Sequence, residues 1–469
     1  MRRRLVLVTA VATLPLLAAG GGADTVLSPA DRSGLSLLVT QEDTALVRDR
    51  RPVTLEKGTQ TLVVEGVARR ARESSGWLTG TGIGVVEQSF QLAGPDADSL
   101  LSAAVGQEAT VVWRDSTGAE REERAKVISA GPQPVFQVGG KVVAGVPSRI
   151  LYDALPADIR LLPAYRASLS VDSAGKREVE LAYLTGGLSW QADYVAEINP
   201  AEDAATLSAW ATLTNTSGAD FTDARVQVMA GDVNTVADAP VRIQRAEKML
   251  VAAAMAPSPT REALGGYHLY ALPQPVTLKD GERKQVSLMA PVRLAAERVL
   301  VLDPMPPSAW RDRAPEPPAQ HPAMVLKLKN GAQPLPAGTI RAFQRAKDGA
   351  AIFLGEDRLP AIPANTSARA TLGRAFDVTV RRSQTDFTRI AADITEAEWQ
   401  IKLANSGDSP AKVIVRESFG GDWLVLAESA RHTKESALVA SWTVMVPAKG
   451  ETMLEYRARV KGPSVPGGG

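Results

Sequence analysis

Three segments of this 469-residue chain share one pattern, in which an alternating strand reaches an Asn and a polar turn before a second strand follows. They span residues 210–228, 325–341 and 399–415. In the third segment Trp399, Ile401 and Leu403 alternate with polar side chains, which is the two-residue period of a strand with one buried face. The asparagines that follow the first strands are Asn215, Asn330 and Asn405. Asn suits a chain reversal because its side chain bonds nearby backbone and because it tolerates left-handed geometry.

Short alternating segments separated by turn signals continue along most of the chain, and residues 95–105 predict a first short helix. We therefore predict a mainly β fold of antiparallel β-sandwich domains, with an N-terminal β-rich region and one or two short helices. The expected organisation is a signal peptide (1–23), an N-terminal β-rich region (24–165), a central β-sandwich region (166–302) with an insertion (244–266), a Pro-rich linker (303–323), a C-terminal β-sandwich region (324–461) and a flexible tail (462–469). The Asn units recur at unequal intervals, so they are building blocks of sheets and not a solenoid repeat.

The first 23 residues have the three parts of a secretory signal. Three arginines precede an apolar run at 5–17, and small residues at 21–23 provide a cleavage site. The run is shorter than the roughly 20 residues of a membrane-spanning helix, and Pro15 interrupts it. We expect export to the periplasm or the extracellular space, with no integral membrane span after the signal is removed.

The chain contains no cysteine, which excludes disulfides, thiolate metal sites and cysteine nucleophiles. Its 53 Lys and Arg nearly balance 52 Asp and Glu, so no global field favours nucleic acid. The three histidines have no metal-ligand spacing, and the HExxH and GxSxG motifs are absent. We expect no cofactor.

Several residues are candidates for a site. Trp77 and Trp423, in glycine-flanked stretches, and Asp422 are candidate ligand-binding residues, whereas Trp210, Trp399 and Trp442 lie in alternating strands that predict packing in the core. Asp232, Asn234 and Asp238 could supply oxygen ligands to calcium, although Asp and Asn are also ordinary turn residues. Carboxylates that could converge for glycoside hydrolysis are Asp193, Glu197, Asp422 and Glu428.

Two adjoining segments carry a more specific resemblance: 183–200 (YLTGGLSWQADYVAEINP) and 209–234 (AWATLTNTSGADFTDARVQVMAGDVN). With 44–67, 267–288, 335–343 and 353–364, they resemble the bacterial family called domain of unknown function 4139, which includes mucoidy-inhibitor-A-like exported proteins. The sequence departs most from the family at 69–84, where a shorter link is expected. The resemblance implies an exported, mostly β protein of unassigned activity, with no catalytic residues to transfer.

These observations favour a non-enzymatic protein that binds or scaffolds an envelope protein or glycan through loops and sheet edges. The alternative is a carbohydrate-active hydrolase, or a factor related to envelope polysaccharide, that uses convergent carboxylates. The oligomeric state is open.

Overall fold

The computed structural model describes residues 24–92, 94, 96–155, 159–231, 267–305, 310–312, 316–346 and 349–462, and the backbone of 261–264. The predicted signal peptide, most of the insertion at 244–266, and tail residues 463–469 lie outside this range. The fold is mainly β, as predicted, with mostly antiparallel sheets and a single α-helix, α1 (Ala97–Ala103). Two single-turn 3₁₀-helices, η1 (Pro29–Asp31) and η2 (Glu73–Ser75), complete the helical elements of this part of the chain. No helix among these residues has the length and apolarity needed to cross a membrane.

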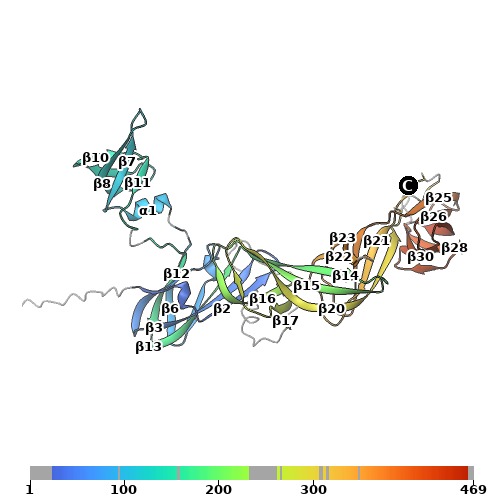
Figure 1. Ribbon diagram of the computed structural model, residues 1–469, viewed down its shortest axis with the longest axis horizontal. Coiled ribbons are helices and arrows are strands. Elements are labelled where there is room, and N and C mark those ends of the chain that lie inside the picture. The colour runs from blue at the N-terminus through green and yellow to red at the C-terminus, as the bar shows by residue number, and fades with distance from the viewer. Residues whose placement is uncertain are drawn as a thin grey trace, which may run out of the picture.

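Two sheets pack together at the amino-terminal end of the described chain (Figure 1). The first has the order β1 (Thr25–Leu27), β4 (Gly58–Glu65), β12 (Ala164–Val171) and β6 (Ile83–Gln91). The second has the order β17 (Arg261–Leu264), β18 (Tyr267–Ala271), β16 (Phe221–Ala230), β2 (Gly34–Thr40), β3 (Ala45–Leu55), β13 (Gly175–Thr185) and β5 (Trp77–Gly80), with β19 (Val276–Leu278) beside β16. Both sheets combine strands from before and after residue 165, so the boundary expected there falls inside β12.

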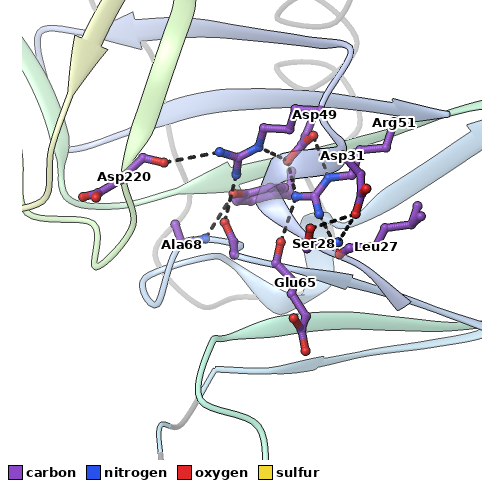
Figure 2. A network of polar contacts seen from close by, with 11 residues as sticks. Leu27, Ser28, Asp31, Asp49, Arg51, Glu65, Ala68 and Asp220 are labelled. Carbon is purple, nitrogen blue, oxygen red and sulfur yellow. Dashed lines mark hydrogen bonds and ion pairs between the residues drawn. The ribbon is translucent and has the colours of Figure 1, made fainter. Parts of the chain in front are cut away.

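A buried polar network joins these two sheets (Figure 2). The Arg51 side chain on β3 is 1% exposed and donates to both carboxylate oxygens of Asp49, at 3.0 and 2.7 Å. It also donates to the backbone oxygens of Leu27 on β1 and Glu65 on β4, at 2.7 and 2.8 Å. A buried charge is tolerated when it is paired and its hydrogen-bonding groups are used, so this network has a structural role.

A small unit is inserted between β6 and β12 and projects from the elongated body (Figure 1). Its sheet has the order β10 (Lys141–Ala144), β9 (Val135–Val138), β8 (Glu120–Ser129), β7 (Glu108–Arg114) and β11 (Arg149–Leu151). Helix α1 begins after Asp96, whose side chain accepts a hydrogen bond from the Ser99 N–H. The unit has its own apolar core, which includes the fully buried Phe136.

The long strand β20 (Arg283–Leu302) connects the middle of the molecule to its carboxy-terminal end (Figure 1). The order of its sheet is β23 (Ala351–Leu359), β22 (Gly338–Arg345), β14 (Leu188–Ile198), β15 (Ala204–Asn215), β20, β27 (Ala411–Ser418), β30 (Val439–Val446) and β29 (His432–Lys434). Off this path, β21 (Ala323–Lys329) pairs with β20 and with β24 (Ser367–Arg374). A last sheet of order β25 (Val378–Arg389), β26 (Ile394–Asn405), β31 (Gly450–Lys461) and β28 (Asp422–Glu428) packs against β27 and β30. The segment predicted as a Pro-rich linker lies between β20 and β21.

The three asparagines at the ends of strands are buried and use their side-chain amides to bind backbone. The Asn215 amide donates to Ala219 O and Leu278 O, at 2.9 and 3.2 Å. Asn330 and Asn405 likewise donate to a carbonyl a few residues ahead and to a carbonyl of a more distant segment. None of the three has a positive φ. They therefore act through the side chain, and the left-handed geometry expected as a second reason for Asn is absent at these positions.

Candidate functional site

The outward face of the central sheet gathers polar and aromatic side chains from five neighbouring strands. On β14 the core receives Trp190, Ala192 and Tyr194, so the residues between them point to the other side. We call this surface the central-sheet face, and its members are Ser189, Gln191, Asp193, Val195 and Glu197 on β14, Ser208, Trp210, Thr212 and Thr214 on β15, Arg283, Gln285 and Ser287 on β20, Thr339, Arg341, Phe343 and Arg345 on β22, and Phe353, Glu356 and Arg358 on β23. The opposite side of the sheet belongs to the main apolar core.

Asp193 is the centre of a hydrogen-bond network that crosses this face. It is 4% exposed, and its carboxylate accepts from the Thr212 hydroxyl at 2.5 Å, from Arg341 Nη1 at 3.1 Å and from Gln191 Nε2 at 3.2 Å. The Thr212 hydroxyl accepts in turn from Gln285 Nε2 at 3.0 Å. Arg341 also pairs with Glu356 at 3.1 Å. The network thus fixes side chains on five adjacent strands.

These contacts determine the ionisation of Asp193. Burial by itself would raise the pKa of its carboxyl group, but the hydrogen bonds from Thr212, Arg341 and Gln191 favour the charged form and bring the pKa below its ordinary value. Asp193 is consequently a carboxylate at neutral pH. It can orient other groups, but it holds no proton to give to a leaving group.

Two pockets open on the central-sheet face. The larger, of about 560 Å³, is lined by the polar side chains of Gln41, Ser189, Gln191, Thr212, Thr214, Thr339, Arg283 and Arg358, together with Trp190, Ala337, Gly338, Leu359 and Pro360. The smaller, of about 300 Å³, is lined by Val195, Glu197, Phe343, Gln344, Arg345 and Ala351. The strand register places Asp193 and its cross-strand neighbour Trp210 between the two pockets.

Trp210 corrects a prediction made from the sequence. The alternating pattern favoured a place in the core, but the indole is 39% exposed. The reason is the phase of β15: Leu207, Ala209, Ala211 and Leu213 are buried, so the even-numbered Trp210 points outward. Trp399 and Trp442 are buried, at 1% and 0% exposure.

The ligand-binding candidates from the sequence lie in other sheets and do not converge. Trp77 is 44% exposed on β5, an edge strand of the second amino-terminal sheet. Trp423 and the exposed Asp422 begin β28 at the carboxy-terminal end. The Trp423 ring stacks on Phe419 with centroids 4.7 Å apart, and Lys434 Nζ lies 5.0 Å from its centroid. Contacts within the chain therefore occupy much of the Trp423 ring.

The candidate carboxylates also separate into two groups. Asp193 and Glu197 share β14, whereas Asp422 and Glu428 share β28 in a different sheet. Glu428 Oε2 lies 2.8 Å from His432 Nδ1 and accepts from Trp442 Nε1 at 2.9 Å, so it links β28 to β29 and β30. The predicted calcium donors Asp232, Asn234 and Asp238 lie outside the described residues. Within the described ranges no group of three or more His, Asp or Glu side chains could hold a metal ion.

Sequence reasoning missed Arg283, Arg341 and Arg358 as members of one surface. A local signal did exist on β14, where Gln191, Asp193 and Glu197 alternate with buried residues. The partner strands could not be read in the same way, because β14 pairs in parallel with the distant β22. Parallel pairing leaves no turn signature in the sequence.

The family model described as "Domain of unknown function (DUF4139)" matches residues 179–464, more than half of the chain. The chain belongs to the DUF4139 family. The DUF4139 match begins in β13 and includes the whole central-sheet face, whereas the inserted unit of β7 to β11 precedes it. No curated protein matches the chain.

Proposed function

We propose that this DUF4139 protein is a non-enzymatic binding protein of the cell envelope whose central-sheet face holds an extended, hydroxyl-rich ligand, an oligosaccharide. The observation that carries this proposal is the polar pocket of about 560 Å³ beside the exposed indole of Trp210, on a face fixed by the Asp193 network. A binding site needs a few convergent polar groups held in place and an apolar surface beside them. Hydroxyl and amide side chains supply the first, and the indole ring supplies the second.

The position of the face favours a saccharide over a peptide added as a strand. Strand addition requires a sheet edge with free backbone N–H and C=O groups. Strands β14, β15 and β22 are interior strands, with partners on both sides. A ligand on this face must be recognised by side chains, so we favour the face over the sheet edges and loops expected from the sequence.

Ionisation argues against a hydrolase at this face. Hydrolysis of a glycosidic bond requires one carboxylic acid with a raised pKa and a second carboxyl group nearby. The pKa of Asp193 is lowered, and Glu356 pairs with the same arginine. Asp193 is therefore held as a carboxylate and cannot serve as that acid. We retain binding, with export as predicted from the amino-terminal sequence, as the proposed function.

Trp210 and Trp77 provide a matched test. Both are Trp residues on strands with similar exposure, 39% and 44%, but only Trp210 belongs to the central-sheet face. Purified protein would be titrated with a panel of neutral and acidic oligosaccharides, and the dissociation constant of each would be determined by isothermal titration calorimetry. We expect Trp210→Ala to weaken binding about tenfold and Trp77→Ala to leave it unchanged, because losing a stacked aromatic ring costs about 1.4 kcal/mol, which is tenfold in affinity. Equal behaviour of the two variants would contradict the proposal.

A further inference from the structure

We infer that the ligand of the central-sheet face carries an anionic group, which the guanidinium groups of Arg283 and Arg358 bind in the larger pocket. This inference rests on the proposed function, since it names the chemical class of saccharide that the face would take. Arg283 enters the pocket from β20 and Arg358 from β23, on opposite sides of β14 and β15. The two strands are far apart in sequence, and the fold brings their arginines to one pocket.

The first argument is charge balance. The lining of the pocket contains two arginines and no Asp or Glu. Within the part of the chain that the structure describes, neither guanidinium forms an ion pair, although most other arginines on neighbouring strands do. Both guanidinium groups are therefore available to pair with an anionic ligand.

The second argument is that nearby carboxylates are already engaged elsewhere. Arg341 pairs with both Asp193 and Glu356. Asp357 accepts hydrogen bonds from the backbone N–H groups of Arg358 and Thr371, at 2.7 and 2.6 Å. The positive charge in the pocket is therefore available to a ligand.

The third argument concerns geometry and the kind of anion. A guanidinium group offers planar, paired N–H donors that match a carboxylate, a sulfate or a phosphate. The hydroxyls of Ser189, Thr214 and Thr339 line the same pocket and can bind the hydroxyl groups of a sugar. An acidic saccharide, bearing a carboxylate or an ester of sulfate or phosphate, combines both features. Trp210 would support the adjoining ring.

The test compares matched saccharides with and without an anionic group. Oligosaccharides of several uronic acids, their methyl esters, and sulfated forms of neutral oligosaccharides would be titrated by calorimetry into the full chain. We expect the acids or the sulfate esters to bind about tenfold more tightly than uncharged counterparts, with a preference that weakens as salt is raised. Preference for the acids would identify a carboxylate as the bound group, and preference for the sulfated forms would identify an ester.

A double variant, Arg283→Gln with Arg358→Gln, is expected to lose this preference while retaining weak binding of the methyl esters. Arg369→Gln is the control, because Arg369 is an exposed arginine on β24 that lines neither pocket. Circular dichroism of each variant would verify that the fold is intact.

The outcomes separate the two claims. Equal affinity for charged and uncharged saccharides, reduced by Trp210→Ala, would overturn the anionic inference and leave the binding function standing. If binding of the acids needs the two arginines but is unaffected by Trp210→Ala, the anion site is supported. The proposal that Trp210 holds a sugar ring is then overturned. No binding of any member of the panel would overturn both.

Discussion

At the scale of single residues, buried side-chain amides close the strand turns of this fold. Asn215 is fully buried, and in addition to its two donated bonds its Oδ1 accepts from the Ser217 N–H at 3.0 Å and the Ser217 hydroxyl at 2.8 Å. The sequence predicted the position and the backbone-bonding role of this residue. It could not show the long-range partner, Leu278 O, because that carbonyl is brought close only by the pairing of β16 with β19.

Replacing Asn215 by Ala is expected to lower the free energy of unfolding by about 2–4 kcal/mol, because buried backbone groups then lose their partners. Asn199→Ala is the control. The Asn199 side chain also makes hydrogen bonds, to Asp203 and the Ala204 N–H, but it lies at a half-exposed turn where water can replace it. Urea denaturation of both variants measures the difference. Similar losses in the two proteins would show that burial does not set the cost.

At the scale of elements, local signals predicted strands and hairpins well, whereas pairing between distant strands could not be predicted. The turn between β9 and β10 was expected from Gly139 and Gly140, and both have positive φ, at 54° and 80°. The hairpin of β7 and β8 was likewise expected. By contrast, the candidate site depends on β14 lying between β15 and β22, and the β22 contact joins segments with no local turn between them. For that reason the sequence pointed to single residues of the site, such as Asp193, but it could not predict that they form one surface with residues of β20, β22 and β23.

The contact between β14 and β22 depends on a glycine. A Cβ atom at Gly338 would overlap the backbone oxygen and carbon of Ala192, neither of which can move without shifting a strand. We expect Gly338→Ala to lower the free energy of unfolding by about 1–3 kcal/mol, the usual cost of overpacking, and to weaken ligand binding because Gly338 lines the larger pocket.

Gly331→Ala is the matched control for this change, because a Cβ atom at Gly331 meets no other atom within 4 Å and its φ is not positive. Thermal unfolding followed by circular dichroism compares the two variants. A Gly338→Ala protein as stable as the Gly331→Ala protein, with unchanged binding, would mean that β22 can move away from β14 at little cost.

At the scale of the whole molecule, the inserted unit of α1 and β7 to β11 is separable from the fold around it. All residues of its apolar core lie between 101 and 152. The strands that flank it remain neighbours, since Gln91 at the end of β6 pairs with Ala164 at the start of β12. The unit also lies outside the DUF4139 match and away from the central-sheet face (Figure 1). Sequence patterns predicted its helix and hairpins, but they did not reveal that it interrupts a sheet.

This separation leads to a prediction for a deletion. Removing residues 93–158 and joining Leu92 to Ile159 through a short Gly-Ser linker keeps Arg160, whose guanidinium pairs with Asp24 and Glu65. Because Gln91 and Ala164 already lie opposite one another, Leu92, the linker and residues 159–163 form the loop that joins two antiparallel strands. We expect the midpoint of thermal unfolding to change by less than about 2 °C, because roughly 1 kcal/mol shifts the midpoint by only one or two degrees in a fold of this size. Saccharide binding is expected to be unchanged. If the deletion protein fails to unfold cooperatively, the inserted unit supports the two amino-terminal sheets. If it folds but no longer binds the saccharide, part of the ligand site lies on the inserted unit.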